Sequence, residues 1–115
     1  MWRDDAYLLD ILLAARKALQ FTERVKWEEF RDSEILQNAV MHQIQIIGEA
    51  ARSLSEAYRD SHPGMHWRGN IGMRNRLVHE YFRIVPARVW KVVVEELPEL
   101  VAQLQPLVPP ESSPS

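Results

Sequence analysis

The chain has 115 residues, of which 46% are hydrophobic and 26% charged, and its formal net charge is -2. This composition is typical of one folded globular domain and excludes a highly charged disordered chain. The absence of cysteine excludes disulfides, thiolate metal sites and cysteine nucleophiles. The longest apolar run, residues 11–15, is too short to span a membrane, and the first residues do not resemble a signal peptide. We therefore expect a cytoplasmic protein with no membrane contact.

The first half of the chain predicts two long amphipathic helices. Apolar residues recur at helical spacing over residues 3–21 and again over residues 36–54, where Ser33 offers an N-cap. Residues 22–32 break this period. We expect them to form a connection that packs Trp27 and Phe30 onto the core.

The second half predicts shorter helices. Residues 60–72 have the proline and glycine content of a loop, and a short third helix is expected from about residue 71 to residues 79–81. Pro86 suits the first turn of a fourth helix that runs to about Leu97, where Pro98 kinks or restarts it. Residues 89–94 are rich in β-branched side chains, but no second strand is available to pair with them, so we predict helix there.

The predicted fold is therefore all-α. We expect a four-helix bundle in which the two long helices are antiparallel and the short helix lies across one end. A single domain should cover residues 1–108, followed by a flexible tail of proline and serine at residues 109–115.

Basic residues concentrate in one segment of an otherwise acidic chain. Between residues 66 and 94 there are six basic residues and one acidic residue, Glu80. A local basic field suits a phosphate-bearing ligand, although a solvated basic face balanced by acidic neighbours in the fold would have the same composition. The six basic residues are Arg68, Arg74, Arg76, Arg83, Arg88 and Lys91.

Four polar residues within this segment could bind a phosphate and move a proton: Arg74, Asn75, His79 and Tyr81. On an ideal helix Asn75 and His79 share one face, whereas Arg74 and Tyr81 share another. Three arrangements would bring them together: the helix unwinds before Tyr81, the arginine reaches around, or two copies meet across a twofold axis. We favour the dimer, because a shallow bundle offers little else to enclose a phosphate.

Each of these residues also has a plain structural interpretation. His79 could stabilise a helix C-terminus, Arg74 could form a surface ion pair, and Tyr81 could be a core aromatic. His62 and His66 have the four-residue spacing of helical metal ligands, but the proline and glycine between them forbid that helix, so no metal site and no cofactor are expected. We expect Glu49, in the second helix, to be a buried partner of an arginine that also orients Arg74.

The motif Arg74-x-x-x-x-His79-x-Tyr81 resembles that of the HepT-like branch of the HEPN superfamily. The flanking blocks agree in order, and the resemblance extends over about residues 7–108. The blocks are residues 46–51, Trp67, residues 71–75, residues 77–81, Val89-Trp90 and residues 97–100.

The resemblance implies a metal-independent RNA endonuclease, the toxin of a two-gene (type VII) toxin–antitoxin module. The active site would be a composite cleft between two copies, in which the ribose 2′-hydroxyl attacks the adjacent phosphodiester. His79 would carry the proton, Arg74 would clamp the phosphoryl charge, and Asn75 would orient either. The implied partner is an MntA-like nucleotidyltransferase antitoxin that silences the toxin by AMP transfer to Tyr81.

A function of a different class is a non-catalytic helical adaptor that binds a nucleotide or a nucleotidyltransferase. It predicts the same fold. Loss of His79 discriminates between the two hypotheses, because it should abolish RNA cleavage by an enzyme and only perturb binding by an adaptor.

Overall fold

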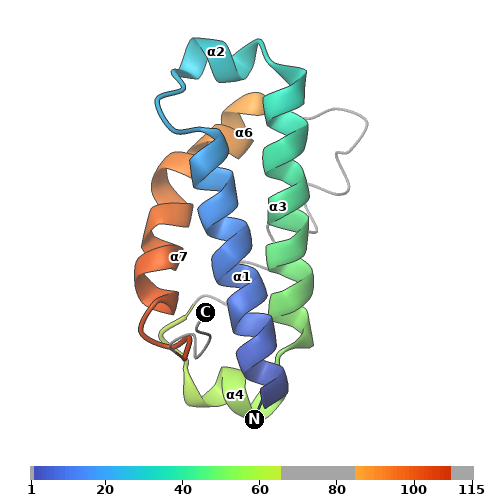
Figure 1. Ribbon diagram of the computed structural model, residues 1–115, viewed down its shortest axis with the longest axis vertical. Helices are drawn as coiled ribbons and strands as arrows, with labels where there is room; N and C mark the ends of the chain where they lie inside the picture. The colour runs from blue at the N-terminus through green and yellow to red at the C-terminus, as the bar shows by residue number, and fades with distance from the viewer. Residues whose placement is uncertain (1, 66–84, 110–115) are drawn as a thin grey trace, which may run out of the picture.

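A computed structural model describes residues 2–65 and 85–109 of the chain. Two helices of 20 residues each, α1 (Trp2–Phe21) and α3 (Glu34–Ser53), run antiparallel and form the centre of the molecule (Figure 1). The described residues contain helices and no strand. The all-α prediction and the antiparallel pairing of the long helices are confirmed.

The core between these helices is built from the two apolar stripes that the spacing predicts. The apolar side chains on the facing sides of α1 and α3 are almost fully inaccessible to solvent, and Ala15, Ile44 and Ile47 are 0% exposed. Apolar burial of this kind supplies most of the stability of a helix pair, because helix propensity alone is weak. The other fully buried side chains of the pair are Leu8, Ile11, Ala18, Val40 and Ala51.

The start of α3 follows from its sequence. Ser33 has an extended backbone, and its hydroxyl oxygen accepts a hydrogen bond from the Leu36 N–H at 3.2 Å. An N-cap of this type satisfies one of the backbone donors that the first helical turn leaves without a partner.

Two short helices of the structure were not predicted from the sequence. The segment 22–32 contains α2 (Trp27–Arg31), whose first turn is closed by Glu29, because its carboxylate accepts a hydrogen bond from the Lys26 N–H at 2.9 Å. A second short helix, α4 (Glu56–Ser61), follows α3 and reaches into the predicted loop at residues 60–72. The expectation of a plain connection was wrong at residues 27–31, and the expected loop was wrong at residues 60–61, where α4 ends. Helices of five or six residues are too short to show a hydrophobic period in the sequence.

The C-terminal part forms one helical rod with a widened turn. It consists of α6 (Pro86–Lys91), the π-helical η1 (Val92–Glu96) and α7 (Leu97–Leu104), which packs on α1 (Figure 1). Pro98 has no N–H to donate to the carbonyl four residues earlier, and its ring clashes with that carbonyl. The preceding turn is widened, and the Leu97 N–H bonds to the carbonyl of Val92, five residues back. The structure thus confirms helix at residues 89–94 and shows how the chain accommodates Pro98.

Two predictions fall on residues that the structure does not describe. The short helix expected from about residue 71 lies within residues 66–84, and the tail lies almost entirely within residues 110–115. That the bundle has four helices and that two copies form a dimer remain predictions. Within the described ranges, no helix is long and apolar enough to cross a membrane.

Candidate functional site

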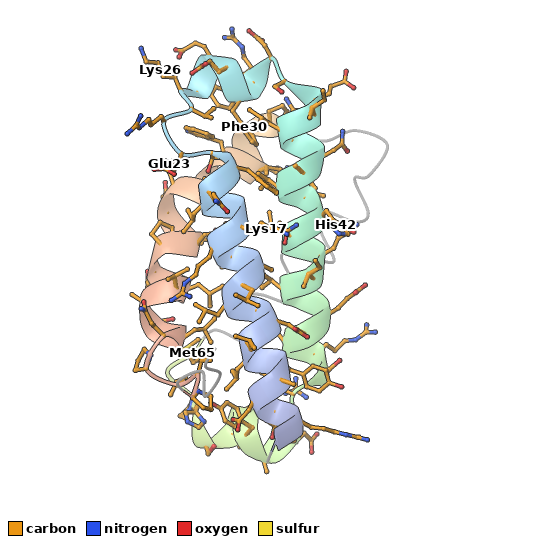
Figure 2. The ribbon with its side chains drawn as sticks, viewed as in Figure 1. Lys17, Glu23, Lys26, Phe30, His42 and Met65 are labelled. Atoms are coloured by element: carbon orange, nitrogen blue, oxygen red, sulfur yellow. The ribbon has the colours of Figure 1, made fainter. Side chains whose placement is uncertain are left out.

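The four polar residues of the predicted motif lie outside the described residues. Arg74, Asn75, His79 and Tyr81 all fall within residues 66–84. The structure does describe the two points between which this segment is attached, at Met65 and at Val85. Of these two anchors, Met65 lies towards the α4 end of the bundle (Figure 2), whereas Val85 is followed by α6, which packs on α2 at the other end (Figure 1).

The anchor at the α4 end begins with a contact between α1 and the start of α4. Ser55 is the N-cap of α4, and its hydroxyl oxygen accepts from the Tyr58 N–H at 3.1 Å. The Asp4 carboxylate accepts two hydrogen bonds from Ser55, one from the backbone N–H at 2.9 Å and one from the hydroxyl at 2.8 Å. Because Asp4 is only 6% exposed, these bonds replace water that the carboxylate would otherwise have.

The α4 end also contains an aromatic stack. The rings of Tyr58 and His62 lie with their centroids 4.2 Å apart and their planes 18° apart. His62 ends α4, and its carbonyl accepts from the Met65 N–H at 3.2 Å, so that Met65 enters the core at 8% exposure. The helix therefore stops at His62, as the proline and glycine after it require. No three potential metal-ligating side chains gather within the described ranges.

The anchor at the α2 end is aromatic and apolar. The chain enters α6 through the extended Val85, with Pro86 at the first helical position. Trp90 then packs on α2: its ring centroid lies 5.1 Å from that of Phe30 and 6.1 Å from that of Trp27. The expected packing of Trp27 and Phe30 onto the core is confirmed, and Phe30 is 0% exposed.

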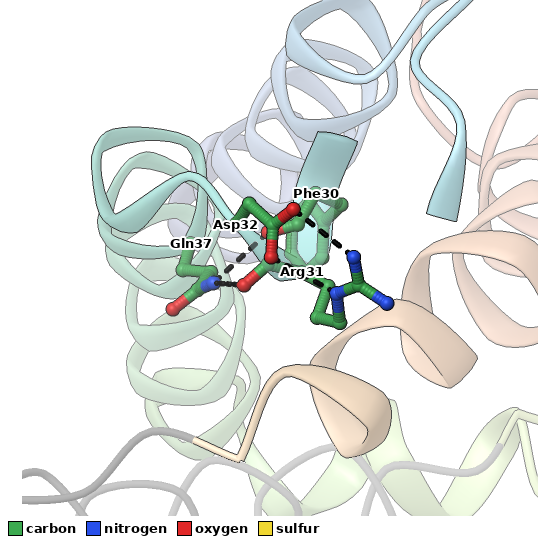
Figure 3. A network of polar contacts seen from close by, with 4 residues as sticks. All are labelled: Phe30, Arg31, Asp32 and Gln37. Atoms are coloured by element: carbon green, nitrogen blue, oxygen red, sulfur yellow. Dashed lines mark hydrogen bonds and ion pairs between the residues drawn. The ribbon is translucent and has the colours of Figure 1, made fainter. Parts of the chain in front are cut away.

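A buried amide fixes α2 to α3. Gln37 is 5% exposed, and its Nε2 donates to the carbonyl oxygens of Phe30 at 2.9 Å and Arg31 at 2.8 Å (Figure 3). These are carbonyls of the last turn of α2, which have no partner within so short a helix. The Phe30 carbonyl also accepts from the Ser33 N–H at 3.2 Å, just after the helix. Arg31 itself pairs with Asp32 through two bonds of 2.9 and 3.0 Å on the exposed side. Gln37 thereby sets the position of Phe30, against which α6 docks.

Part of the predicted basic segment is described and lies on α6. Arg88 and Lys91 are exposed, while Val89, between them, is 0% exposed. Both cations lie in the last turn of α6, from which the chain continues as helix into η1. The remaining four basic residues of the segment, Arg68, Arg74, Arg76 and Arg83, lie outside the described ranges.

Glu49 does not have the predicted environment. It lies on α3, next to the buried Gly48, but its own side chain is exposed. The expectation of a buried carboxylate was wrong, because position 49 falls on the outer face of α3, between the core residues Ile47 and Ala51. A role of Glu49 in orienting Arg74 stays a prediction.

Two titratable groups at the α4 end have shifted pKa values. The Ser55 N–H, followed by the Ser55 hydroxyl, lowers the pKa of Asp4 against the opposing effect of burial. Burial, together with the nearby Asp5 and Asp4, raises the pKa of Tyr58. This end of the bundle is therefore held by a carboxylate that stays ionised.

Sequence reasoning missed Gln37 and Asp4, which hold the two anchors. Gln37 occupies a helix position three residues before the core residue Val40. A polar residue on an apolar stripe is the signal that could have identified it. Asp4 gave no such signal. Its partner is 51 residues away in the chain, and acidic residues in a first helical turn are common.

The comparisons with known proteins bear on the region between the anchors. A family model described as "Ribonuclease HepT-like" matches residues 11–107, a range that includes Met65, Val85 and the motif between them. The chain belongs to the HepT-like family. The recognition made from the motif and its flanking blocks is confirmed.

Relatives within the HepT-like family cover nearly the whole chain. MJ1380 of Methanocaldococcus jannaschii, which is named as a candidate RNase, is 34% identical over 87% of this chain and 92% of its own length. A protein of Thermococcus cleftensis with the name "Probable ribonuclease HepT" is 34% identical over 88% of this chain and 92% of its own length. TTE0752 of Caldanaerobacter subterraneus, also named as a candidate RNase, is 30% identical over 89% and 91%. No solved structure matches the chain.

Proposed function

We propose that this protein is a metal-independent RNA endonuclease. The observation that carries the proposal is the family match over residues 11–107, which includes the complete motif of Arg74, His79 and Tyr81. The ribonuclease names of the relatives support the same substrate.

The motif supplies the groups that RNA transesterification needs. The 2′-oxygen of a ribose bonds to the adjacent phosphorus, and the bond from that phosphorus to the 5′-oxygen of the next nucleotide breaks. A base removes the 2′-proton and an acid protonates the leaving 5′-oxygen, so the products carry a 2′,3′-cyclic phosphate and a 5′-hydroxyl. His79 is the proton carrier, and Arg74 stabilises the charge that develops on the phosphoryl oxygens.

The proposed site is shared by two copies. One imidazole cannot be base and acid at the same moment, whereas two copies of His79 facing each other across a twofold axis can divide these roles. Asn75 orients His79 or the phosphate, and Glu49, on α3, orients Arg74. The exposed cations of α6, Arg88 and Lys91, add to the attraction for RNA.

The chain is further proposed to be the toxin of a two-gene toxin–antitoxin module in the cytoplasm. The antitoxin, an MntA-like nucleotidyltransferase, would transfer AMP from ATP to the hydroxyl of Tyr81 and release pyrophosphate. The adenylate adds negative charge and bulk beside Arg74 and His79, and this excludes the RNA phosphate.

The test is cleavage of a tRNA or total-RNA pool by purified protein in the presence of a chelator. Wild type should produce cyclic-phosphate and 5′-hydroxyl ends, and His79→Ala and Arg74→Ala should lower the rate by about 100-fold or more, the scale of losing a general acid or base. Tyr81→Phe should still cleave and should resist silencing by ATP and the neighbouring nucleotidyltransferase. Circular dichroism of each variant controls for folding.

The alternative, a non-catalytic adaptor that binds a nucleotide or nucleotidyltransferase, predicts a different result. Wild type whose Tyr81 is shown by mass spectrometry to be unmodified would then leave RNA intact. That outcome would overturn the nuclease proposal.

A further inference from the structure

Two glutamines of α3 are equally buried, but only one of them has a partner in the fold. Gln37 is 5% exposed, and its amide donates to the carbonyls of Phe30 and Arg31. Gln43 is 7% exposed, yet in the described part of the chain no hydrogen bond engages its side chain. Buried amides in folded proteins almost always have a partner. The fold therefore explains Gln37 and leaves Gln43 to be explained.

Gln43 lines a groove between α1 and α3. The volume of the groove is about 420 Å³, which is within the usual range for a site that binds a small organic group. Leu13, Ala14 and Ile46 supply its apolar surface. Leu13 is 51% exposed and is one of the few large apolar side chains that the described residues leave to solvent. The groove thus presents an amide beside apolar side chains, and none of its lining residues belongs to the predicted motif.

The rim of the groove has opposite charges at its two ends. Along α1, Asp10 lies one helical turn before Leu13, and Arg16 and Lys17 lie one turn after it. Lys17 extends from α1 towards α3 (Figure 2). Among the residues that the structure describes, no ion pair or hydrogen bond engages the side chains of these three charged residues. All three are therefore available to a ligand.

This order of groups matches one nucleotide of a single strand. A nucleotide has an anionic phosphate at one end and, at the other, a base with an apolar face and an edge of hydrogen-bond donors and acceptors. An amide offers one donor and one acceptor, so the side chain of Gln43 can pair with such an edge. Asp10 can accept from a base amino group. A ligand made only of negative charges would be repelled by Asp10 and would leave Gln43 without a partner.

We propose that this α1–α3 groove is a subsite that binds one unpaired nucleotide of the RNA, outside the bond that is cleaved. Arg16 and Lys17 bind a backbone phosphate. Leu13 contacts the face of the base, and the amide of Gln43 pairs with its edge. The identity of the strand rests on the proposed function, but the subsite positions RNA and takes no part in the chemistry. An amide that the fold leaves without a partner is then retained because the ligand supplies one.

Binding of an RNA that cannot be cleaved tests the subsite. The probe is a fluorescein-labelled single strand of about 12 nucleotides with 2′-O-methyl riboses, which lack the free 2′-hydroxyl that the proposed reaction needs. Fluorescence anisotropy measures its Kd with the full chain. Gln43→Leu should raise the Kd roughly tenfold, the scale of a lost pairing with a base edge. Gln45→Leu is the matched control and should bind like wild type, because position 45 is on the same helix but does not line the groove.

The cations predict a different signature from the amide. Binding of a single strand weakens with salt, with a logarithmic slope of about 0.7 for each phosphate that a cation neutralises. Lys17→Gln should therefore lower that slope by about 0.7. Gln43→Leu should leave the slope unchanged, because an amide neutralises no phosphate.

Stability separates a subsite from a structural role. Gln43→Leu removes an amide that has no partner among the described residues, so it should not lower the free energy of unfolding. Gln37→Ala, which removes two hydrogen bonds of the fold, should lower it. Weaker RNA binding without a loss of stability is the result expected for Gln43→Leu alone.

The proposal is overturned by a wild type that does not bind the probe, or by a Gln43→Leu protein that binds it as tightly as wild type. It is also overturned if sedimentation shows that Gln43→Leu changes the mass of the protein, because the groove would then hold another copy of the chain. If Gln43→Leu fails to fold by circular dichroism, the exposed Lys17→Gln decides through the salt slope. Failure of the nuclease proposal looks different: wild type would leave ordinary RNA intact and still bind the probe through the groove.

Discussion

The two ends of the bundle hold the chain on either side of residues 66–84 by different physical means. At the α2 end, Trp90 packs on Phe30, and the buried amide of Gln37 caps the short helix that carries Phe30. At the α4 end, the contact is ionic in part, because the Asp4 carboxylate accepts both hydrogen bonds that Ser55 donates. The anchor at the α2 end has no titratable group in these contacts, whereas the anchor at the α4 end depends on the Asp4 carboxylate.

This difference teaches that the two anchors respond to different perturbations. Aromatic packing is lost by removing volume and is insensitive to pH, whereas a carboxylate contact is lost by protonation. Since the predicted motif is attached to both ends, either loss can displace it. The following three predictions test this contrast.

The largest effect is expected at the α2 end from Phe30→Ala. Removal of a fully buried ring that contacts Trp90 leaves a cavity, and the free energy of unfolding should fall by about 3–5 kcal/mol. Denaturant unfolding measures it, and hydrogen exchange should rise first in α2 and α6. Ile35→Ala, at a position 83% exposed on α3, serves as the control and should have little effect. A loss below 1 kcal/mol for Phe30→Ala would show that α6 does not depend on this packing.

A smaller loss is expected from Gln37→Ala. The substitution removes one donor from the Phe30 carbonyl, which keeps the Ser33 N–H at 3.2 Å, and removes the Gln37 donor from the Arg31 carbonyl. This should cost about 1–3 kcal/mol of unfolding free energy. The next residue provides a matched control. Asn38 also donates to a carbonyl, that of Glu34 at 2.8 Å, but on the exposed side, where water replaces it. Equal losses for Gln37→Ala and Asn38→Ala would contradict the role assigned to burial.

The sequence was enough to predict the long helices, because their apolar residues repeat at helical spacing over several turns. The stripes of α1 and α3 extend over five turns, so the helical period and the Ser33 cap were enough to predict both helices and their pairing. The helices α2 and α4 have five and six residues, too few to establish a period. Pro98 predicted a kink or a restart of the last helix, and the structure has a widened turn before the proline, in which the Leu97 N–H bonds to the Val92 carbonyl.

For the candidate site, too, one part could be predicted from the sequence and another could not. The motif of Arg74, His79 and Tyr81 was enough to predict the family, because spacing and flanking blocks are properties of sequence. Burial was harder to predict. Glu49 lies on the exposed face of α3, and Gln37, twelve residues earlier, is buried, although both are polar residues near an apolar stripe. Which polar residue faces inward is decided by the neighbouring helix.

The smallest effect, and the one that distinguishes the two ends most sharply, is expected from Asp4→Asn. At neutral pH the amide cannot accept both bonds from Ser55 as well as the carboxylate does, and unfolding free energy should fall by about 1–2 kcal/mol. The Ser55 N–H lowers the pKa of Asp4 in the folded state below its ordinary value of about 3.9. The carboxylate therefore stabilises the fold fully above that ordinary value, and its contribution disappears as the pH falls through the lower, folded-state pKa.

Urea unfolding of wild type and Asp4→Asn between pH 7 and pH 2.5 measures this dependence. The difference between the two proteins should be constant down to about pH 4 and shrink below it, because protonated Asp4 and asparagine then offer similar acceptors. The difference between wild type and Gln37→Ala should stay the same over this range, since no titratable group takes part in that contact. If the Asp4→Asn difference also stays constant, the α4 end is held by the geometry of Ser55 and not by the charge of Asp4, and the contrast between the two ends is lost.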